Sequence, residues 1–239
     1  MPHKEVQNIN KKDMHNSSML RMKWFVENHV SKINKSKIKI LDVGSYDVNG
    51  SYKELFIGDQ YEYYGLDMEE GPNVDIVIEN PYDWSTLGVE TYDVVISGQA
   101  FEHIEFFWLT MANMATVLKK DGLICIVVPC GSEEHRYPVD CYRFFTDGMI
   151  ALARYVNFEI LHSHTNRAPK PTEKEWFSVK DADSFLIAKK NYEGPVKYVD
   201  ISSYKCIPID HSSVYEGFVK YKRNLIAKIA RQIYKWGEK

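Results

Sequence analysis

The chain has 239 residues, a formal net charge of −3 and 44% hydrophobic residues, which fits one α/β domain with additions. A charge so close to zero gives no signal for a nucleic-acid partner. The first residues carry no apolar signal core, and no apolar run approaches the ~20 residues that span a bilayer, so we expect a cytoplasmic protein. The four cysteines show no C-x-x-C spacing and are expected to stay reduced.

The predicted elements start with an amphipathic helix over residues 14–32. Apolar segments then predict five strands in chain order: 38–44, 61–68, 74–80, 91–98 and 123–129. Helical periodicity follows the first, fourth and fifth of these strands, at 51–58, 100–118 and 146–156. Ser51 and Thr146 are the expected N-caps of the first and last of these helices. Two closing strands are predicted at 158–164 and 184–190.

This order of elements predicts an α/β fold, a Rossmann-like doubly wound sheet. The first, fourth and fifth strands are nearly continuous apolar runs, as expected for parallel strands covered by helices on both faces. We expect the sheet domain to span residues 37–190. An N-terminal helical segment precedes it at 1–36, and a C-terminal extension follows at 191–239.

The loop after the first strand, in "KIKILDVGSYDVNGSYKELF", is the first candidate for ligand binding. Ligands of doubly wound sheets bind beyond the carboxyl ends of the strands, and Gly44 lets the backbone approach a ligand closely. Asp67 ends the second strand, where a carboxylate can accept hydrogen bonds from ribose hydroxyls. The pattern G-x-G-x-x-G is absent, because Tyr46 and Asp47 fill the loop. A ligand with a ribose and an amino-acid tail therefore fits better than a dinucleotide.

Four segments in order resemble the motifs of class I S-adenosylmethionine-dependent methyltransferases: "ILDVGSYDVNG", "YGLDME", "YDVVISGQAFEHI" and "ATVLKKDGLICIVVP". The likeness covers residues 37–190 and is greatest to small-molecule methyltransferases, of the kind seen in surface-polysaccharide or sugar-linked pathways. It implies S-adenosylmethionine as cofactor and a seven-stranded sheet whose last strand is antiparallel. Two positions depart from the usual pattern: the first motif lacks its three-glycine form, and Asp121 replaces a glycine in "KKDG".

The same resemblance implies a set of cofactor-binding residues at the ends of four strands. Those expected to hold the methionine part are Asp42, Gly44 and Ser45, with Ser97, Gly98 and Gln99 beneath it. Those expected to hold the nucleoside are Asp67 at the ribose, Met68 against the adenine, and Asn80, Pro81 and Tyr82 at the adenine edge. Asn80 stands where an acid is usual, and its carboxamide can still bond the base.

Two histidines are candidates for the proton acceptor that a hydroxyl substrate requires. His103 follows the fourth strand, and His135 follows the fifth, with His135 slightly favoured. A histidine at the start of a helix can instead brace the fold or the cofactor. The period-two pair His162 and His164 has no apparent third ligand, so no metal site is predicted.

The polar segment 133–145 after the fifth strand is the expected acceptor-binding segment, because long connections there carry substrate recognition in α/β enzymes. Its candidate residues, suited to a polar and even anionic acceptor, are Arg136, Tyr137, Asp140 and Arg143. An exposed loop held by internal salt bridges is the alternative.

These features predict methyl transfer from S-adenosylmethionine to a small polar acceptor, with an oxygen of a sugar or of an acidic surface-polysaccharide precursor as the first choice. Transfer to nitrogen, a nucleotide-sugar enzyme that uses the same loop for a ribose, and a cofactor-binding module without turnover stay open. The segment 217–239 predicts a basic amphipathic helix. Such a helix can pack on its own domain, dock on an acidic partner or lie on an anionic membrane.

Overall fold

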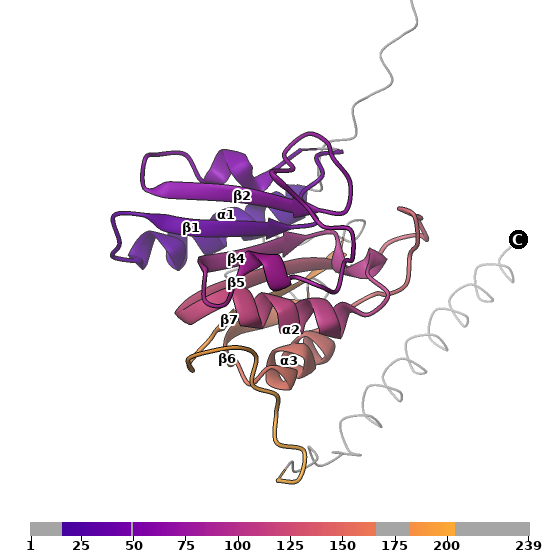
Figure 1. Cartoon of the computed structure of the whole chain (residues 1–239). Helices are drawn as coiled ribbons and strands as arrows, with labels where there is room; N and C mark the ends of the chain where they lie inside the picture. Colours follow the sequence, from indigo (N-terminus) through magenta and orange to yellow (C-terminus); the bar gives the residue numbers. More distant parts are fainter. Residues whose placement is uncertain (1–15, 49, 166–181, 204–239) are drawn as a thin grey trace, which may run out of the picture. The chain divides into compact units, whose positions relative to one another are not determined.

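The computed structural model describes residues 16–48, 50–165 and 182–203, and those of the described residues that precede Asp200 belong to one compact unit. Seven strands form a single sheet (Figure 1). The strands are β1 (Ile38–Val43), β2 (Tyr61–Asp67), β3 (Ile76–Val77), β4 (Tyr92–Gly98), β5 (Leu118–Gly131), β6 (Glu159–Thr165) and β7 (Ala182–Lys189). The α-helices are α1 (Asn16–Asn28), α2 (Phe107–Val117) and α3 (Thr146–Tyr155).

The order of the strands is β3-β2-β1-β4-β5-β7-β6. The pairs among β1 to β5 are parallel, whereas β7 runs antiparallel to both of its neighbours. This confirms the prediction of a Rossmann-like, seven-stranded α/β sheet whose last strand is antiparallel. The chain builds one half outward from β1 and then returns to β4, so the order reverses between β1 and β4. Ligands of such sheets bind outside the carboxyl ends of the strands at this reversal.

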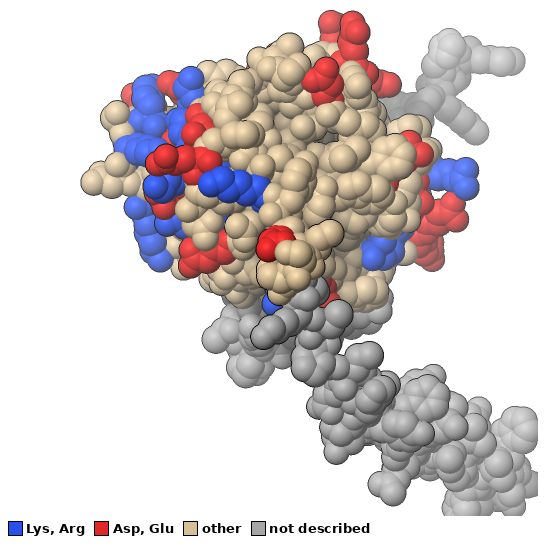
Figure 2. Space-filling model, turned by 60° about the horizontal axis from the view of Figure 1, so that its bottom comes forward, with Lys and Arg blue, Asp and Glu red and all other residues tan. Residues whose placement is uncertain are grey.

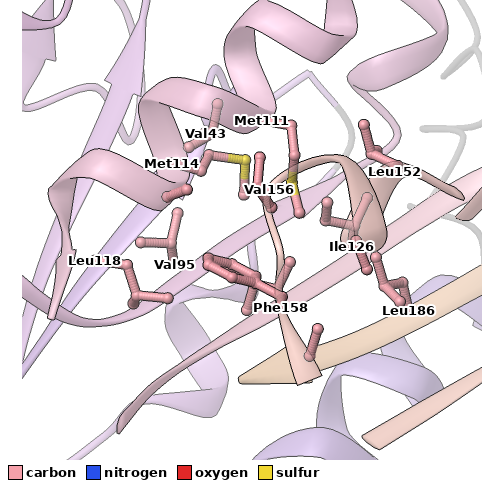
Figure 3. Packing of buried hydrophobic residues seen from close by; sticks show 14 of the residues in the cluster. Val43, Val95, Met111, Met114, Leu118, Ile126, Leu152, Val156, Phe158 and Leu186 are labelled. Carbon is pink, nitrogen blue, oxygen red and sulfur yellow. The ribbon is translucent and has the colours of Figure 1, made fainter. Parts of the chain in front are cut away.

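Helices cover the two faces of the sheet with separate apolar clusters. Methionines and alanines of α2 and α3 pack on one face, and Figure 3 shows Met111, Met114 and Leu152 against side chains of β1, β4, β5 and β7. On the other face, Met22 and Phe25 of α1 pack against β4, β5 and β7. Alternate residues of a strand point to opposite faces, and burial on both faces explains the continuous apolar runs of the central strands.

Several predicted helices are shorter than their periodicity indicated. The segment after β1 holds a 3₁₀-helix, η2 (Tyr52–Leu55), in which the Ser51 hydroxyl accepts from Lys53 N at 3.1 Å, so the cap was predicted correctly and the α-helix was not. The helix expected at 100–118 divides into a 3₁₀-helix, η4 (Phe101–His103), and α2. "KKDG" lies within β5 instead of closing a helix.

Two further expectations about helix ends and segments need correction. Thr146 is the first residue of α3 and Phe145 holds the N-cap position without a side-chain cap, so the cap at Thr146 was wrong. The first helix ends at Asn28 and is followed by a 3₁₀-turn, η1 (Val30–Lys32). The predicted basic helix at 217–239 lies outside the described residues.

Charged side chains are unevenly distributed over the surface. In Figure 2 lysines, arginines and acidic residues gather at the left and right of the face shown, further acidic residues stand at its top, and most of the middle carries neither sign. Lys35 and Lys119 both pair with Asp93, at 2.5 Å and 3.0 Å. Among the described helices, none is long and apolar enough to cross a membrane.

Candidate cofactor and acceptor site

The loops that follow β1 and β4 touch each other at the reversal of the sheet. Gly44 adopts φ +75°, which favours glycine, and a Cβ built there would overlap the Cβ of Ala100. The amides of Gly44 and Ser45 donate to Leu66 O of β2 at 2.9 Å and 3.2 Å. The loop therefore holds a sharp turn beside three strand ends, and Gly44 at this turn is exposed.

Asp67 ends β2 with its carboxylate fixed by the backbone. One oxygen accepts from Tyr46 N at 3.0 Å and the other from Met68 N at 2.7 Å. Each carboxylate oxygen can accept a second bond, so two ribose hydroxyls can still be bound. The Met68 side chain beside it is 49% exposed and is available to cover a base. These contacts fit the roles expected for the ribose and adenine.

Asp42 differs from Asp67 because it is only 3% exposed. The hydroxyl of Tyr63, on the neighbouring strand, donates to its carboxylate. Burial raises the pKa of Asp42 to about 7, against the opposing effect of the Tyr63 hydrogen bond, and the negative charge of Asp67 raises it further. A cationic ligand nearby would favour the ionised form, as expected for the ammonium and sulfonium of the cofactor.

This raised pKa predicts a pH dependence of stability. Between pH 4 and 7 the folded state of the free protein holds a proton on Asp42 that the unfolded state has released, so the free energy of unfolding falls as the pH rises. Asp42→Asn should remove this contribution, on the order of a few kcal/mol, while keeping an acceptor for Tyr63. Urea unfolding of both proteins across this pH range measures it. A difference that is independent of pH would contradict the prediction.

The loop after β3 is held in place by its own side chains. Asn80 Oδ1 accepts from Tyr82 N at 3.0 Å, an Asx-type turn that leaves the amide NH₂ of Asn80 available. The Tyr82 hydroxyl accepts from Phe106 N at 3.2 Å, and Pro81 O accepts from Trp84 Nε1 at 2.9 Å. The loop thus connects the predicted adenine contacts to the segment between β4 and α2.

The end of β4 meets the N-terminal helix. Ser97 donates to Val43 O at 2.8 Å, and the ring of Tyr52 fills the space where a Cβ of Gly98 would stand. Gln99 has φ +57°, and its amide donates to Ser18 Oγ at 3.3 Å and to Asp183 Oδ1 at 3.2 Å.

Four residues that meet this strand end were not predicted from the sequence: Ser17, Ser18, Tyr52 and Asp183. Ser17 donates to Asp183, and the hydroxyls of Ser18 and Tyr52 lie 2.6 Å apart. They come from α1, η2 and β7, which only the folded sheet brings together. The one available signal was a pair of adjacent serines at the start of an amphipathic helix.

The two candidate histidines, predicted as alternatives, lie side by side. The ring centroids of His103 and His135 are 5.1 Å apart, with the rings nearly perpendicular. His103 N bonds Ala100 O at 2.9 Å, so the η4 turn links this pair directly to the residue that touches Gly44. Burial lowers the pKa of His103, which favours the neutral ring that a proton acceptor needs.

Glu102 lies directly beside this pair, and it was not among the candidate residues predicted from the sequence. Its side chain is 0% exposed, and Oε1 is 3.7 Å from His103 Nε2. Burial raises its pKa to about 8, although the backbone amide of Glu102 itself and the positive charge of Arg143 oppose this shift. No other described residue forms a hydrogen bond with either carboxylate oxygen. An unpartnered carboxylate in such a place is costly and is typical of a functional site.

Arg143 and Asp140 hold the acceptor segment together. Arg143 donates to both oxygens of Asp140, at 2.5 Å and 2.7 Å, and to the carbonyls of Ser132, Glu133 and Tyr142. These contacts use all five N–H groups of a guanidinium. The pKa of Asp140 consequently lies well below its usual range. In this state Arg143 braces the loop, the alternative considered for this segment.

The other two residues predicted to bind the acceptor lie on the surface of the segment. Arg136 donates to Glu134 at 3.0 Å, and both side chains are mostly exposed, so this pair adds little stability. Tyr137 is 58% exposed, and its amide bonds Val139 O at 3.2 Å. Both side chains can turn toward an acceptor without breaking a buried contact.

Comparison with known proteins agrees with this geometry. Residues 41–126 match the family model described as a methyltransferase domain. This range runs from β1 into β5 and contains every predicted cofactor residue. No curated protein matches the chain.

Solved structures share the fold at low sequence identity. One is a 1,6-didemethyltoxoflavin-N1-methyltransferase of Burkholderia thailandensis with bound S-adenosylhomocysteine, at 16% identity and TM-score 0.55, covering 73% of this chain and 79% of that chain. Others are methyltransferases described as S-adenosylmethionine-dependent. The protein of Archaeoglobus fulgidus has 15% identity and TM-score 0.52, and the match covers 72% of this chain and 95% of that chain. The protein of Methanosarcina mazei has 15% identity and TM-score 0.51, and the match covers 69% of this chain and 97% of that chain.

The sheet order and the strand-end loops define a class I methyltransferase fold, and the domain match covers those same loops. The chain is accordingly an enzyme of the S-adenosylmethionine-dependent methyltransferase class, and its cofactor is S-adenosylmethionine.

Proposed function

We propose that this enzyme methylates a hydroxyl group of a small polar acceptor in the cytoplasm, with a sugar or an acidic surface-polysaccharide precursor as the first substrate class to test. The observation that carries the proposal is the Glu102–His103–His135 cluster, one turn away from the cofactor loop. A hydroxyl must lose its proton as it attacks the methyl group, whereas many nitrogen acceptors already offer a lone pair. The cluster supplies the groups that handle such a proton.

Transfer itself is an in-line displacement at the sulfonium methyl group. The acceptor oxygen forms a bond to the methyl carbon while the carbon–sulfur bond breaks and leaves its electron pair on sulfur. Because the methyl group is already activated, alignment of the two reactants provides much of the acceleration. The cofactor loop would fix the donor, and the segment from Glu133 to Phe145 would fix the acceptor.

The proposal is tested with labelled S-adenosylmethionine and fractionated extracts of small polar metabolites. We expect label in a methyl ether of a saccharide or a related hydroxy compound, with stoichiometric S-adenosylhomocysteine. Label in a methylamine would instead support nitrogen transfer. S-adenosylhomocysteine binding without turnover on any fraction would support a cofactor-binding module. Binding of a nucleotide-sugar in its place would support an enzyme that uses the loop for that ribose.

Asp67→Ala should weaken S-adenosylhomocysteine binding by about tenfold or more, because bonds to a charged acceptor contribute roughly 1.5–3 kcal/mol each. Its carboxylate also accepts from two loop amides, so Asp67→Asn serves as the matched variant that keeps the side-chain shape. Calorimetry with S-adenosylhomocysteine and with NAD measures both. Unchanged affinity in Asp67→Ala would show that the nucleoside binds elsewhere.

Transfer to nitrogen is the second candidate. The Burkholderia thailandensis protein that shares this fold is an N1-methyltransferase. An amine or ring nitrogen needs alignment more than a base. Replacing the histidines discriminates between the two functions: loss of activity supports hydroxyl transfer, and full activity supports nitrogen transfer.

A further inference from the structure

We propose that Glu102, His103 and His135 bind one divalent transition-metal ion. Each side chain offers one ligand atom, and the three atoms lie within 4.8 Å of one another. Glu102 and His103 come from the turn after β4, and His135 comes from the segment after β5. The three residues therefore meet at the carboxyl end of the sheet, where the cofactor loop also lies.

The buried carboxylate is the first observation that points to an ion. Glu102 is 0% exposed, and no other residue in the described parts of the chain forms a hydrogen bond with either of its oxygens. Buried carboxylates are normally paired or bound to a metal, since an isolated one is strongly destabilising. Arg143, the cation that acts on Glu102 electrostatically, directs its N–H groups to Asp140 and to backbone carbonyls instead.

The orientation of both imidazoles is the second observation. His103 Nδ1 lies 2.5 Å from Val139 O, and His135 Nδ1 lies 3.0 Å from Glu133 O. A carbonyl only accepts, so each Nδ1 carries the proton and each Nε2 keeps its lone pair. Metal-binding histidines commonly donate their second nitrogen to a carbonyl or carboxylate in this way.

Residues of the acceptor segment hold the third ligand, His135, in place. Asp140 Oδ2 accepts from His135 N at 2.7 Å and lies 3.7 Å from His135 Nδ1, and Arg143 fixes that same carboxylate. By fixing Asp140, Arg143 would help to hold His135 close to Glu102. Arg143 and Asp140 are positioning residues in this proposal.

The three ligand atoms need to move only slightly closer together to bind one ion. An ion at about 2.1 Å from each ligand allows ligand atoms to be at most about 4.2 Å apart. His103 Nε2 and Glu102 Oε1 already satisfy this at 3.7 Å. The side chain of His135 is 48% exposed and can move inward on its loop.

Two imidazoles and one carboxylate select the chemical class of the ion. This set suits Zn²⁺, Fe²⁺, Co²⁺ or Mn²⁺, whereas Ca²⁺ and Mg²⁺ prefer oxygen ligands throughout. Three protein ligands leave at least one coordination position open, as in catalytic sites. The site can therefore bind an oxygen of another molecule.

The function of the ion rests on the proposed hydroxyl transfer. A hydroxyl bound at the open position would release its proton to solvent more readily, because the ion stabilises the resulting alkoxide. The alkoxide oxygen would then form its bond to the methyl carbon as the carbon–sulfur bond breaks. In this arrangement the histidines hold the ion and do not take the proton themselves.

The experiment measures metal binding apart from activity. Full-length protein is freed of metal with a chelator, dialysed, and titrated with Zn²⁺ by calorimetry and with Co²⁺ by visible absorption. We expect one ion per chain and a rise in Tm with added Zn²⁺, since an ion that binds only the folded state stabilises it. Glu102→Gln, His103→Ala and His135→Ala should each weaken binding by at least about tenfold.

Two matched controls locate the ion. His162→Ala changes the histidine pair on β6, and Cys141→Ser removes an exposed thiol, and both should bind as the unchanged protein does. The absence of Zn²⁺ and Co²⁺ binding would overturn the proposal, and so would affinity retained in all three ligand variants or lost in either control. Circular dichroism verifies that each variant is folded.

The metal site and the proposed reaction can fail separately. A bound ion whose removal leaves methyl transfer unchanged would overturn its role in catalysis while the site itself stands. Methylation of nitrogen would overturn hydroxyl transfer and leave the binding result intact. Transfer to a hydroxyl by metal-free protein, with no binding of either ion, would overturn the site and leave the proposed function intact.

Discussion

Gly44→Val should destroy cofactor binding and destabilise the domain. Gly44 has φ +75°, a conformation that costs a non-glycine residue about 1–2 kcal/mol. The added Cβ would also overlap Ala100 Cβ, and overpacking of this kind costs roughly 1–3 kcal/mol. The free energy of unfolding should fall by about 2–5 kcal/mol. Affinity for S-adenosylhomocysteine should fall at least about tenfold, because the loop backbone must move.

Ala100→Gly separates the two causes of this loss. In the double variant the overlap is relieved and the backbone strain remains, so we expect partial recovery of stability. Gly148→Ala in α3 is the control, because nothing lies within 4 Å of its added Cβ. That change should leave affinity unaltered and raise stability by about 0.5–1 kcal/mol. Normal cofactor binding by a folded Gly44→Val protein would place the ligand away from this loop.

The sheet could be predicted because its signals are local. Apolar runs bounded by glycine, proline or polar residues located every strand, and their continuity in β1, β4 and β5 showed that both faces are covered. The lengths of the helices were harder to predict from the sequence. Tyr52, Leu55 and Phe56 follow β1 at helical spacing. Phe56 nevertheless packs against Tyr61 and Tyr63 at the amino end of β2. The short connection then has room for a single 3₁₀-turn.

The grouping of the strand-end residues was also predictable, since the topology of a doubly wound sheet places them together. Their partners were not, because contacts such as Gln99 with Asp183 join residues far apart in sequence. The contacts of Arg143 could not be predicted from the sequence either. Its charge suggested an anionic acceptor, whereas the fold surrounds it with one carboxylate and three carbonyls. Residue type indicates what a side chain can bind, and geometry decides what it does bind.

The histidine pair shows how this limit affects mechanism. His103 and His135 were predicted as competing bases, one in each of two loops. The structure places their rings 5.1 Å apart, and Glu102, on the same turn as His103, lies close to both. The two histidines are therefore parts of one cluster. Residues that act as a unit give losses that do not add. This property can be measured and provides a stricter test than either single change.

His103→Ala and His135→Ala should each slow methyl transfer to a hydroxyl by about 10²–10⁴-fold, the usual contribution of a group that handles the proton. The double variant should be about as slow as the slower single variant, because either change disables the cluster. Affinity for S-adenosylhomocysteine should stay within about twofold in all three, since neither residue belongs to the loops that hold the cofactor. His162→Ala should retain full activity.

Single-turnover assays with labelled cofactor measure the transfer step itself, once an acceptor is found in the metabolite fractions. Full activity in both single variants would mean that no histidine is needed, and it would move the function to nitrogen or to alignment alone. Losses that multiply in the double variant would mean that the two rings act separately, which contradicts a shared proton-handling or metal-binding unit. Loss in His103→Ala with full activity in His135→Ala would assign the proton to the turn after β4 and remove His135 from the site.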